Sequence, residues 1–390
     1  MLENQSIVFS LFLIFTGAAC FATLALFARQ ALIVGYIVLG VLVGPWGAGW
    51  IADTGLIANL AEIGIIFLLF LLGLHLTPQK LWLLLKQTLL VTLLTSIIFG
   101  LVGAAIALGF GFTLAESALV GVAAMFSSTI VGIKLLPTTV LHHRHTGEVI
   151  ISVLLLQDLI AIVVLLALQG LETGALGWLD FGRLALALPV LIGAAFLAER
   201  YLLMPLFRRF DRIQEYMFLL TLAWCLGIAQ LAHSVGLSYE IGAFIGGIVV
   251  ATSPIALFIA ESLKPLRDFF LVMFFFAMGA SLDLDVAVLV LPPAIVLGVV
   301  MLGVKPVVYR YALGRVAESA TLAWETGWRL GQMSEFSLLI TFLAVQSVLI
   351  GQEVAIMIQL ATLITFIGSS TIVVLRFPTP VGVSDKLRRD

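Results

Sequence analysis

Charge is scarce in this sequence. Asp, Glu, Lys and Arg make up 11% of its 390 residues and hydrophobic residues make up 62%, whereas a soluble domain carries about 25% charged residues. This composition argues against an ordinary soluble enzyme and predicts a protein that crosses the membrane several times. The net charge of −2 gives no indication of nucleic-acid binding.

Cysteines and enzyme motifs are also scarce. Cys20 and Cys225 both lie in apolar segments, which favours small core residues over a disulfide or a metal site. The sequence contains no His-Glu-x-x-His and no Gly-x-x-x-x-Gly-Lys-Ser/Thr motif. We therefore expect no enzyme activity and no cofactor beyond transported ions.

Apolar segments of roughly 15–25 residues, long enough to span a bilayer as helices, follow one another along the chain. We distinguish 13 of them, at residues 6–27, 31–44, 57–76, 86–109, 115–136, 147–168, 184–206, 215–233, 238–252, 264–281, 287–312, 321–347 and 353–376. The expected fold is an all-α polytopic membrane protein with 13 transmembrane helices. If 184–206 is a connector, the two six-helix halves have inverted orientations, as in many secondary transporters.

Basic residues favour one side of these segments. With the N-terminus outside, 17 of the 20 Lys and Arg residues fall in inside connections or in the tail. Arg183 is the single basic residue outside, and Lys305 and Arg329 lie within segments. Because cytoplasmic loops are enriched in Lys and Arg, this asymmetry predicts a cytoplasmic C-terminus.

Two segments carry a polar interruption at the same place in each half. The fifth contains Phe126-Ser127-Ser128-Thr129 and the twelfth contains Gly331-Gln332-Met333-Ser334-Glu335-Phe336-Ser337. Interruptions of this kind indicate discontinuous helices that meet at a binding site. Taken alone, hydroxyl residues in a transmembrane helix often bond back to that helix, and Glu335 fits a structural brace as well as a ligand.

Asp158 lies midway along the apolar segment 147–168. A carboxylate at the bilayer centre is costly and usually marks an ion or proton pathway. The alternative is an aspartate that only bonds a neighbouring helix. Gln157 fits either an ion ligand or a residue that holds a neighbouring helix in place.

Lys305 lies deep in the segment 287–312, directly before Pro306. An ammonium group there needs a partner, and we expect an ion pair with Asp158. The alternative is that Lys305 extends to the inner surface. Glu325 and Arg329 are four residues apart and are expected to form a local pair on a helix.

Several motifs, in order from residue 30 to 376, resemble those of the monovalent cation:proton antiporter-2 family, and within it the Kef-type potassium/proton antiporters. The resemblance rests on five stretches: Gly35-Tyr36 with Gly44-Pro45, Ala61–Leu74, Gly236–Gly247, Phe274–Gly279 and Gly331–Phe336. The Gln157-Asp158 pair resembles the potassium-linked branch, whereas sodium-linked relatives more often have Asn-Asp or Asp-Asp.

The resemblance implies an antiporter that exchanges K+, or alternatively Na+, for H+ in the bacterial inner membrane. It implies a homodimer, with scaffold helices in 6–76 and 215–281 and moving core helices in 86–168 and 287–376. Elevator-like motion of the core would expose Asp158 alternately to the two sides. The implied cation and proton site comprises Asp158, Gln157, Lys305, Ser127, Ser128, Thr129, Gln332 and Glu335.

Two departures from the family pattern affect what is expected. His75 stands where many relatives have Glu at the end of the third span. Kef systems usually append a cytoplasmic nucleotide-binding domain, whereas here residues 381–390 form a tail or the start of a linker after the exchanger domain 1–380. A passive cation channel and a membrane sensor that moves no ions are the competing functions, and an Asp158–Lys305 pair argues against the channel.

Overall fold

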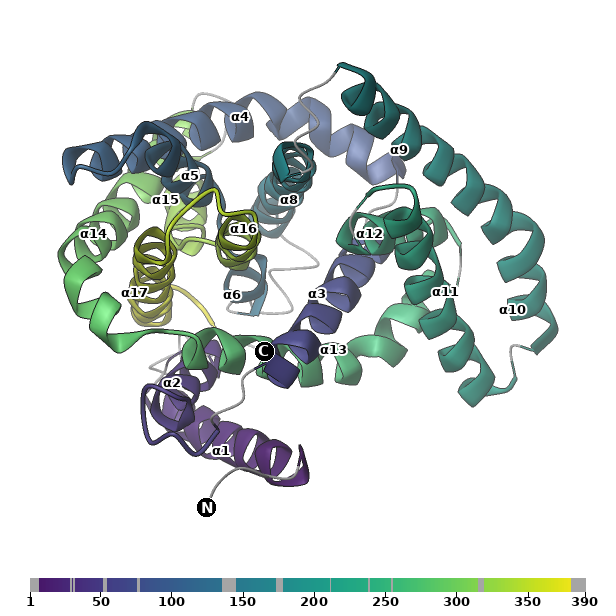
Figure 1. Ribbon diagram of the computed structural model, residues 1–390. Helices are drawn as coiled ribbons and strands as arrows, with labels where there is room; N and C mark the ends of the chain where they lie inside the picture. The colour runs from purple at the N-terminus through teal and green to yellow at the C-terminus, as the bar shows by residue number, and fades with distance from the viewer. Residues whose placement is uncertain are drawn as a thin grey trace. The chain divides into compact units, whose positions relative to one another are not determined.

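The computed structural model describes residues 7–28, 30, 32–51, 55–75, 78–134, 145–172, 178–210, 212–237, 239–253, 255–314 and 319–379. The chain divides into two compact units, which are treated separately. Figure 1 shows that both are built from helices. Residues 1–52, 84–161 and 278–390 form the first unit, and residues 53–83 and 162–277 form the second.

The first unit holds both polar interruptions. Its helices are α1 (Ile7–Phe27), α2 (Leu32–Val43), most of α4 (Pro78–Gly109), α5 (Leu114–Met125), α6 (Thr129–Lys134), the first part of α8 (His145–Glu172), α14 (Leu284–Gly314), α15 (Ala320–Arg329), α16 (Glu335–Gln346) and α17 (Gln352–Arg376).

The second unit is built around a close helix pair. Its helices are α3 (Gly55–His75), the end of α8, α9 (Trp178–Ala198), the π-helix η1 (Glu199–Leu203), α10 (Met204–Phe210), α11 (Gln214–Ser234), α12 (Tyr239–Val250) and most of α13 (Ala256–Ala280). α3 packs on α12 through Gly73 and Gly247. A Cβ on Gly247 would overlap the carbonyl oxygen of Phe70, so only glycine permits this approach.

The helices follow the predicted apolar segments. Each of the 13 segments contains helix in the described residues, and the fifth and twelfth are each split in two. The predicted interruptions are therefore confirmed. Among the described residues, six helices or parts of helices are long and apolar enough to cross a membrane: Ile7–Phe27, Thr88–Gly109, Leu186–Phe210, Gln214–Ser234, Leu284–Gly314 and Gln352–Arg376.

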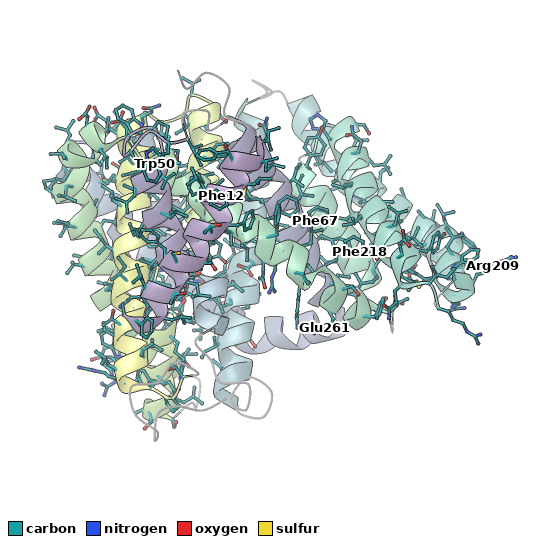
Figure 2. All side chains as sticks on the ribbon, turned by 90° about the horizontal axis from the view of Figure 1, so that it is seen from below. Phe12, Trp50, Phe67, Arg209, Phe218 and Glu261 are labelled. Atoms are coloured by element: carbon teal, nitrogen blue, oxygen red, sulfur yellow. The ribbon has the colours of Figure 1, made fainter. Side chains whose placement is uncertain are left out.

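Large apolar side chains cover much of the helix surfaces, as expected for a protein that contacts lipid. Phe12 on α1 is 57% exposed (Figure 2). Arg209, in the last turn of α10, is a charged residue near a helix end, and its side chain extends away from the helix in Figure 2. α1 and α2, which were expected among the scaffold helices, belong to the unit that holds the broken helices.

Candidate functional site

The two interrupted helices meet at their breaks. α5 ends at Met125 and α6 begins at Thr129, while α15 ends at Arg329 and α16 begins at Glu335. The Ser127 hydroxyl donates to the carbonyl oxygen of Leu330 at 2.9 Å. The Gln332 side-chain amide donates to the carbonyl oxygen of Ser128 at 3.2 Å. Both bonds join segments about 200 residues apart in sequence.

The helix ends at this junction carry opposite partial charges. The C-terminal ends of α5 and α15 present carbonyl groups, whereas the N-terminal ends of α6 and α16 present N–H groups. Local serines satisfy part of the N–H set. The Ser128 hydroxyl accepts from Val131 N at 3.1 Å, and the Ser334 hydroxyl accepts from Phe336 N at 3.1 Å.

Lys305 occupies the carbonyl side of the junction. Its ammonium donates to the carbonyl oxygens of Phe126 at 2.6 Å and Gln332 at 2.9 Å, and to the Ser127 hydroxyl at 3.3 Å. It also lies 5.3 Å from the centre of the Phe99 ring, within cation–π range. One charged group therefore binds both breaks at once.

Both expectations for Lys305 are wrong in this conformation. Its three hydrogen-bond acceptors are carbonyl and hydroxyl oxygens, so it forms no ion pair with Asp158. The side chain is fully buried, so it does not extend to the inner surface. The physical reason is that carbonyl groups freed by a helix break are an alternative partner for a buried ammonium.

Asp158 lies on α8 beside the start of α6. It is 1% exposed. The Thr129 hydroxyl lies 3.2 and 3.3 Å from its two carboxylate oxygens and donates to them. Within the described part of the chain, no basic side chain lies within ion-pair distance of this carboxylate.

Glu335 begins α16 and acts on Asp158 electrostatically. It is 4% exposed, and the Ser334 hydroxyl lies 3.4 Å from its carboxylate. Two buried carboxylates thus act on each other next to a hydroxyl group. Repulsion between them favours the uptake of one positive charge, carried by a proton or by a cation.

Gln157 hydrogen-bonds the backbone on both sides of the first break and also Tyr309. Its amide oxygen accepts from Ser127 N at 3.0 Å, and its amide nitrogen donates to Met125 O and to the Tyr309 hydroxyl, each at 3.0 Å. Of the two roles considered for Gln157, these bonds correspond to the one that holds a neighbouring helix.

The Gln332 side chain joins the second break to α17 and to the first break. Its amide oxygen accepts from the Ser369 hydroxyl on α17 at 2.8 Å, while its amide nitrogen donates to Ser128. Met333 N donates to Thr365 of α17 at 2.9 Å. α17 therefore supports the unwound backbone of the second break.

Tyr309 is part of this junction, although sequence reasoning did not single it out. It is fully buried, one turn after Lys305 on α14. Its hydroxyl accepts from the Gln157 side-chain amide at 3.0 Å, and the side chains of Ser127 and Thr95 are its other polar neighbours. The available signal was spacing, because residues four apart share one helix face, so a polar ring four residues after a buried lysine faces the same junction.

The expected pair between Glu325 and Arg329 is confirmed. Arg329 Nη2 lies 2.8 Å from the Glu325 carboxylate, and the arginine side chain is fully buried. The same guanidinium donates to the carbonyl oxygen of Pro378 at 2.9 Å and lies over the Phe377 ring at 5.6 Å. Arg329 thus ties the chain after α17 to the end of α15.

Some expectations concern parts outside the described residues. The side chain of His75 and the tail 381–390 are among them.

Broken helices that meet beside a buried carboxylate are typical of ion-transporting membrane proteins of the secondary-transporter class. The family model for the transmembrane part of the sodium/hydrogen exchangers matches residues 11–377. The chain belongs to this family, so the expectation of a cation/proton antiporter family is confirmed.

One relative and one solved structure show the range of similar proteins. The chain is 31% identical over 315 residues to the iron transporter MagA of Paramagnetospirillum magneticum strain AMB-1, covering 80% of this chain and 72% of that protein. Its fold is similar to that of the sodium proton antiporter MjNhaP1 from Methanocaldococcus jannaschii at pH 8. The TM-score is 0.71 at 16% identity, with 94% of this chain and 95% of that one covered.

Proposed function

We propose that this protein is a secondary active antiporter that exchanges a monovalent cation, K+ first and Na+ second, for H+. Asp158 binds the cation or the proton in competition. The observation that carries the proposal is the buried carboxylate of Asp158, which has Thr129 as its hydrogen-bond donor and Glu335 as an electrostatic neighbour.

The charges at the junction explain why one site exchanges two ions. Lys305 is engaged with backbone carbonyls and does not neutralise Asp158. A proton or a cation that binds Asp158 from solution relieves its repulsion by Glu335. A site that one ligand must leave before the other binds couples their fluxes.

The residues around Asp158 divide into two groups in this proposal. Asp158, Thr129 and Glu335 supply oxygen ligands for the cation. Lys305, Gln157, Gln332, Ser127 and Ser128 hold the backbone of the two breaks, so that the ligands keep their positions while the core moves. This division also supports elevator-like alternating access, since a junction cross-linked by so many hydrogen bonds is suited to move as one body.

We rank K+ before Na+ because the Gln157-Asp158 pair is similar to that of the potassium-linked branch. Na+ fits the same oxygen ligands. We further propose a homodimer in a bacterial inner membrane with a cytoplasmic C-terminus, as the resemblance and the distribution of basic residues imply.

Iron is the second candidate cargo, because the relative MagA is named an iron transporter. Ferrous iron prefers imidazole and carboxylate ligands. The described residues contain no group of three or more His, Cys, Asp or Glu side chains that could hold a metal ion. This favours a weakly bound monovalent cation over iron.

The test is proton flux in proteoliposomes, reported by a pH-sensitive dye while K+, Na+, Li+ or Fe2+ is added in turn. Wild type is compared with Asp158→Asn and with Asp285→Asn, a control on an exposed aspartate in the first turn of α14. We expect K+ to dissipate the proton gradient in wild type and in the control, but not in Asp158→Asn. If only Na+ dissipates the proton gradient, the transported cation is Na+ and not K+. If only Fe2+ does so, iron is the favoured cargo.

A matched experiment separates exchange from a passive channel. An imposed proton gradient should drive K+ accumulation against its own gradient. Cation flux that never runs uphill would favour the channel, and Asp158→Asn flux equal to that of wild type would refute the role of Asp158.

A further inference from the structure

A row of hydroxyl side chains runs along one face of α4. The row consists of Thr88, Thr92, Thr95 and Ser96. Thr92 lies four residues after Thr88, and Thr95 and Ser96 lie three and four residues after Thr92. These spacings place all four on the same side of the helix. All four are buried, with exposures of 6% or less. An apolar membrane helix has no need of four buried hydroxyls, so the row calls for an explanation.

Two of these hydroxyls have no hydrogen-bond partner in the described protein. They are the side-chain oxygens of Thr92 and Ser96. The other two are occupied, because Thr95 donates to the Thr92 carbonyl at 3.1 Å and Thr88 has a partner. Buried polar atoms are nearly always satisfied by protein or by ordered water, and a buried water needs several polar partners to be stable.

The row leads to the ion-binding junction. Thr95 is a polar neighbour of the Tyr309 hydroxyl, which accepts from the Gln157 amide at 3.0 Å and also neighbours Ser127. Ser127 accepts from Lys305. A continuous set of polar groups therefore connects α4 with both broken helices.

Beyond Ser96 the same helix is closely packed. A Cβ on Gly100 would lie 2.8 Å from the Met125 methyl group, and one on Gly103 would lie 2.8 Å from the Ala124 Cβ. The ring of Phe99, fully buried, packs edge-on against Tyr309 at 5.3 Å. The polar row thus ends at the level of the junction and is closed on the far side.

We propose that the hydroxyls of Thr92 and Ser96 bind a short file of water molecules, which leads along α4 from the Thr88 end to Tyr309. From Thr88 to Ser96 this path spans about 12 Å at 1.5 Å per residue. A proton passes along such a file when each oxygen accepts one proton and releases another to its neighbour, so no further reactant is needed. The binding of water at Thr92 and Ser96 does not depend on the proposed function, whereas the use of this water as a proton route rests on the proposed antiport.

Cysteine accessibility tests the hydration directly. In a background with Cys20→Ala and Cys225→Ala, Thr92→Cys and Ser96→Cys are exposed to a small water-soluble thiosulfonate. The control is Val91→Cys on the same helix, since Val91 is 3% exposed and belongs to an apolar cluster. We expect the two hydroxyl positions to be labelled at least about tenfold faster than position 91, because the reacting thiolate is suppressed in dry apolar surroundings. Equal, slow labelling at all three positions would overturn the proposal.

Near-isosteric variants provide a second measurement that does not depend on cysteines. Thr92→Val and Ser96→Ala should slow proton exchange several-fold without weakening cation binding. Thr221→Val, whose hydroxyl bonds its own helix at Met217 O, should exchange like wild type. If the hydroxyls are dry, both α4 variants should instead raise the melting temperature and leave exchange unchanged, because they remove unsatisfied polar atoms.

The outcomes distinguish the two proposals. Rapid labelling of positions 92 and 96 in a protein that exchanges no protons would refute the antiport and leave the water file standing. Normal antiport with unlabelled cysteines and unaffected Thr92→Val and Ser96→Ala variants would refute the water file alone.

Discussion

The ammonium of Lys305 lies 2.6 Å from the carbonyl oxygen of Phe126, the residue that caps the C-terminal end of α5. The two residues are 179 positions apart in sequence. A lysine charge at this place compensates for carbonyl groups that the helix break has left without an N–H partner. Lys305 is thus a structural part of the junction, and its hydrogen bonds go to the two breaks and not to Asp158.

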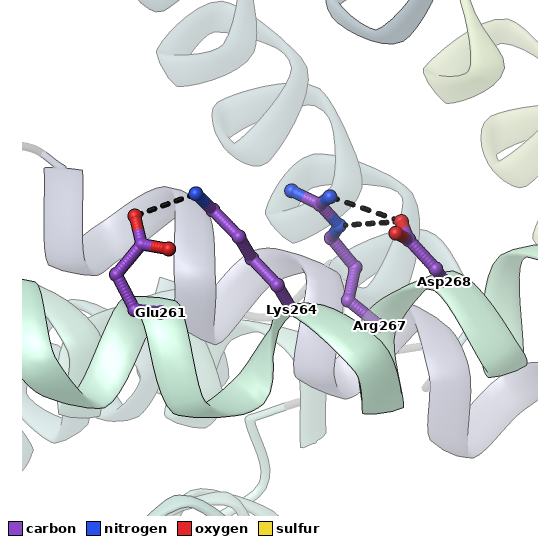
Figure 3. Close-up of polar contacts among 4 residues, drawn as sticks. All are labelled: Glu261, Lys264, Arg267 and Asp268. Atoms are coloured by element: carbon purple, nitrogen blue, oxygen red, sulfur yellow. Dashed lines mark hydrogen bonds and ion pairs between the residues drawn. The ribbon is translucent and has the colours of Figure 1, made fainter.

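Replacing this lysine should destabilise the fold. Lys305→Met leaves two buried carbonyl oxygens without a charged donor, which we expect to cost about 3 kcal/mol of unfolding free energy. The measurement is the melting temperature in detergent, with Lys264→Met as control. Lys264 pairs with Glu261 on the exposed side of α13 (Figure 3), and exposed pairs contribute about 0–1 kcal/mol. Equal melting temperatures for the two variants would contradict the role given to Lys305.

Gln157 should affect stability more than ion choice. Gln157→Leu removes two hydrogen bonds to the first break and one to Tyr309, so the melting temperature and the exchange rate should both fall. The ratio of K+ to Na+ exchange rates should stay that of wild type, because the amide oxygen is occupied by Ser127 N. Gln352→Leu at the exposed start of α17 serves as control. A changed ion ratio in Gln157→Leu at normal stability would instead identify Gln157 as a cation ligand.

Arg329 should differ sharply from an arginine in an exposed pair. Arg329→Gln leaves Glu325 and the Pro378 carbonyl without their buried partner, which should cost about 3–5 kcal/mol. Arg267→Gln breaks the exposed pair with Asp268 at 2.9 Å (Figure 3) and should cost about 0–1 kcal/mol. Chemical unfolding of both variants tests the difference, and a small effect at Arg329 would show that its contacts to the chain after α17 are dispensable.

Two glycines in the second unit should respond to alanine with opposite signs. Gly247→Ala places a methyl group against the Phe70 carbonyl and the backbone of Gly73, so we expect a loss of about 1–3 kcal/mol from overpacking. Gly227 on α11 has open space around its Cβ position. Gly227→Ala should therefore stabilise the helix by about 0.5–1 kcal/mol. Thermal melts compare the two, and a tolerated Gly247→Ala would show that α3 and α12 can move apart at little cost.

The helices, and the places where two of them break, could be predicted from the amino-acid sequence. Long apolar runs become helices because lipid offers no hydrogen-bond partners for the backbone, and the polar stretches around Ser127 and Gln332 interrupt those runs at matching places. The sequence also identified Asp158 and Lys305 as buried charges, because a charge within an apolar segment needs no structure to be noticed. The local pair of Glu325 and Arg329 followed from helical spacing alone.

The groups that those charges contact could not be predicted in this way, because they depend on the packing of the helices. The opposite charges of Lys305 and Asp158 predicted an ion pair between them. The backbone carbonyls at a helix break cannot be recognised as partners from residue types, because every residue has one. The tertiary structure also placed Tyr309 between Thr95 and Gln157, and α1 and α2 in the unit with the broken helices. Such contacts join residues far apart in the chain, and they depend on how helices pack rather than on the periodicity within any one of them.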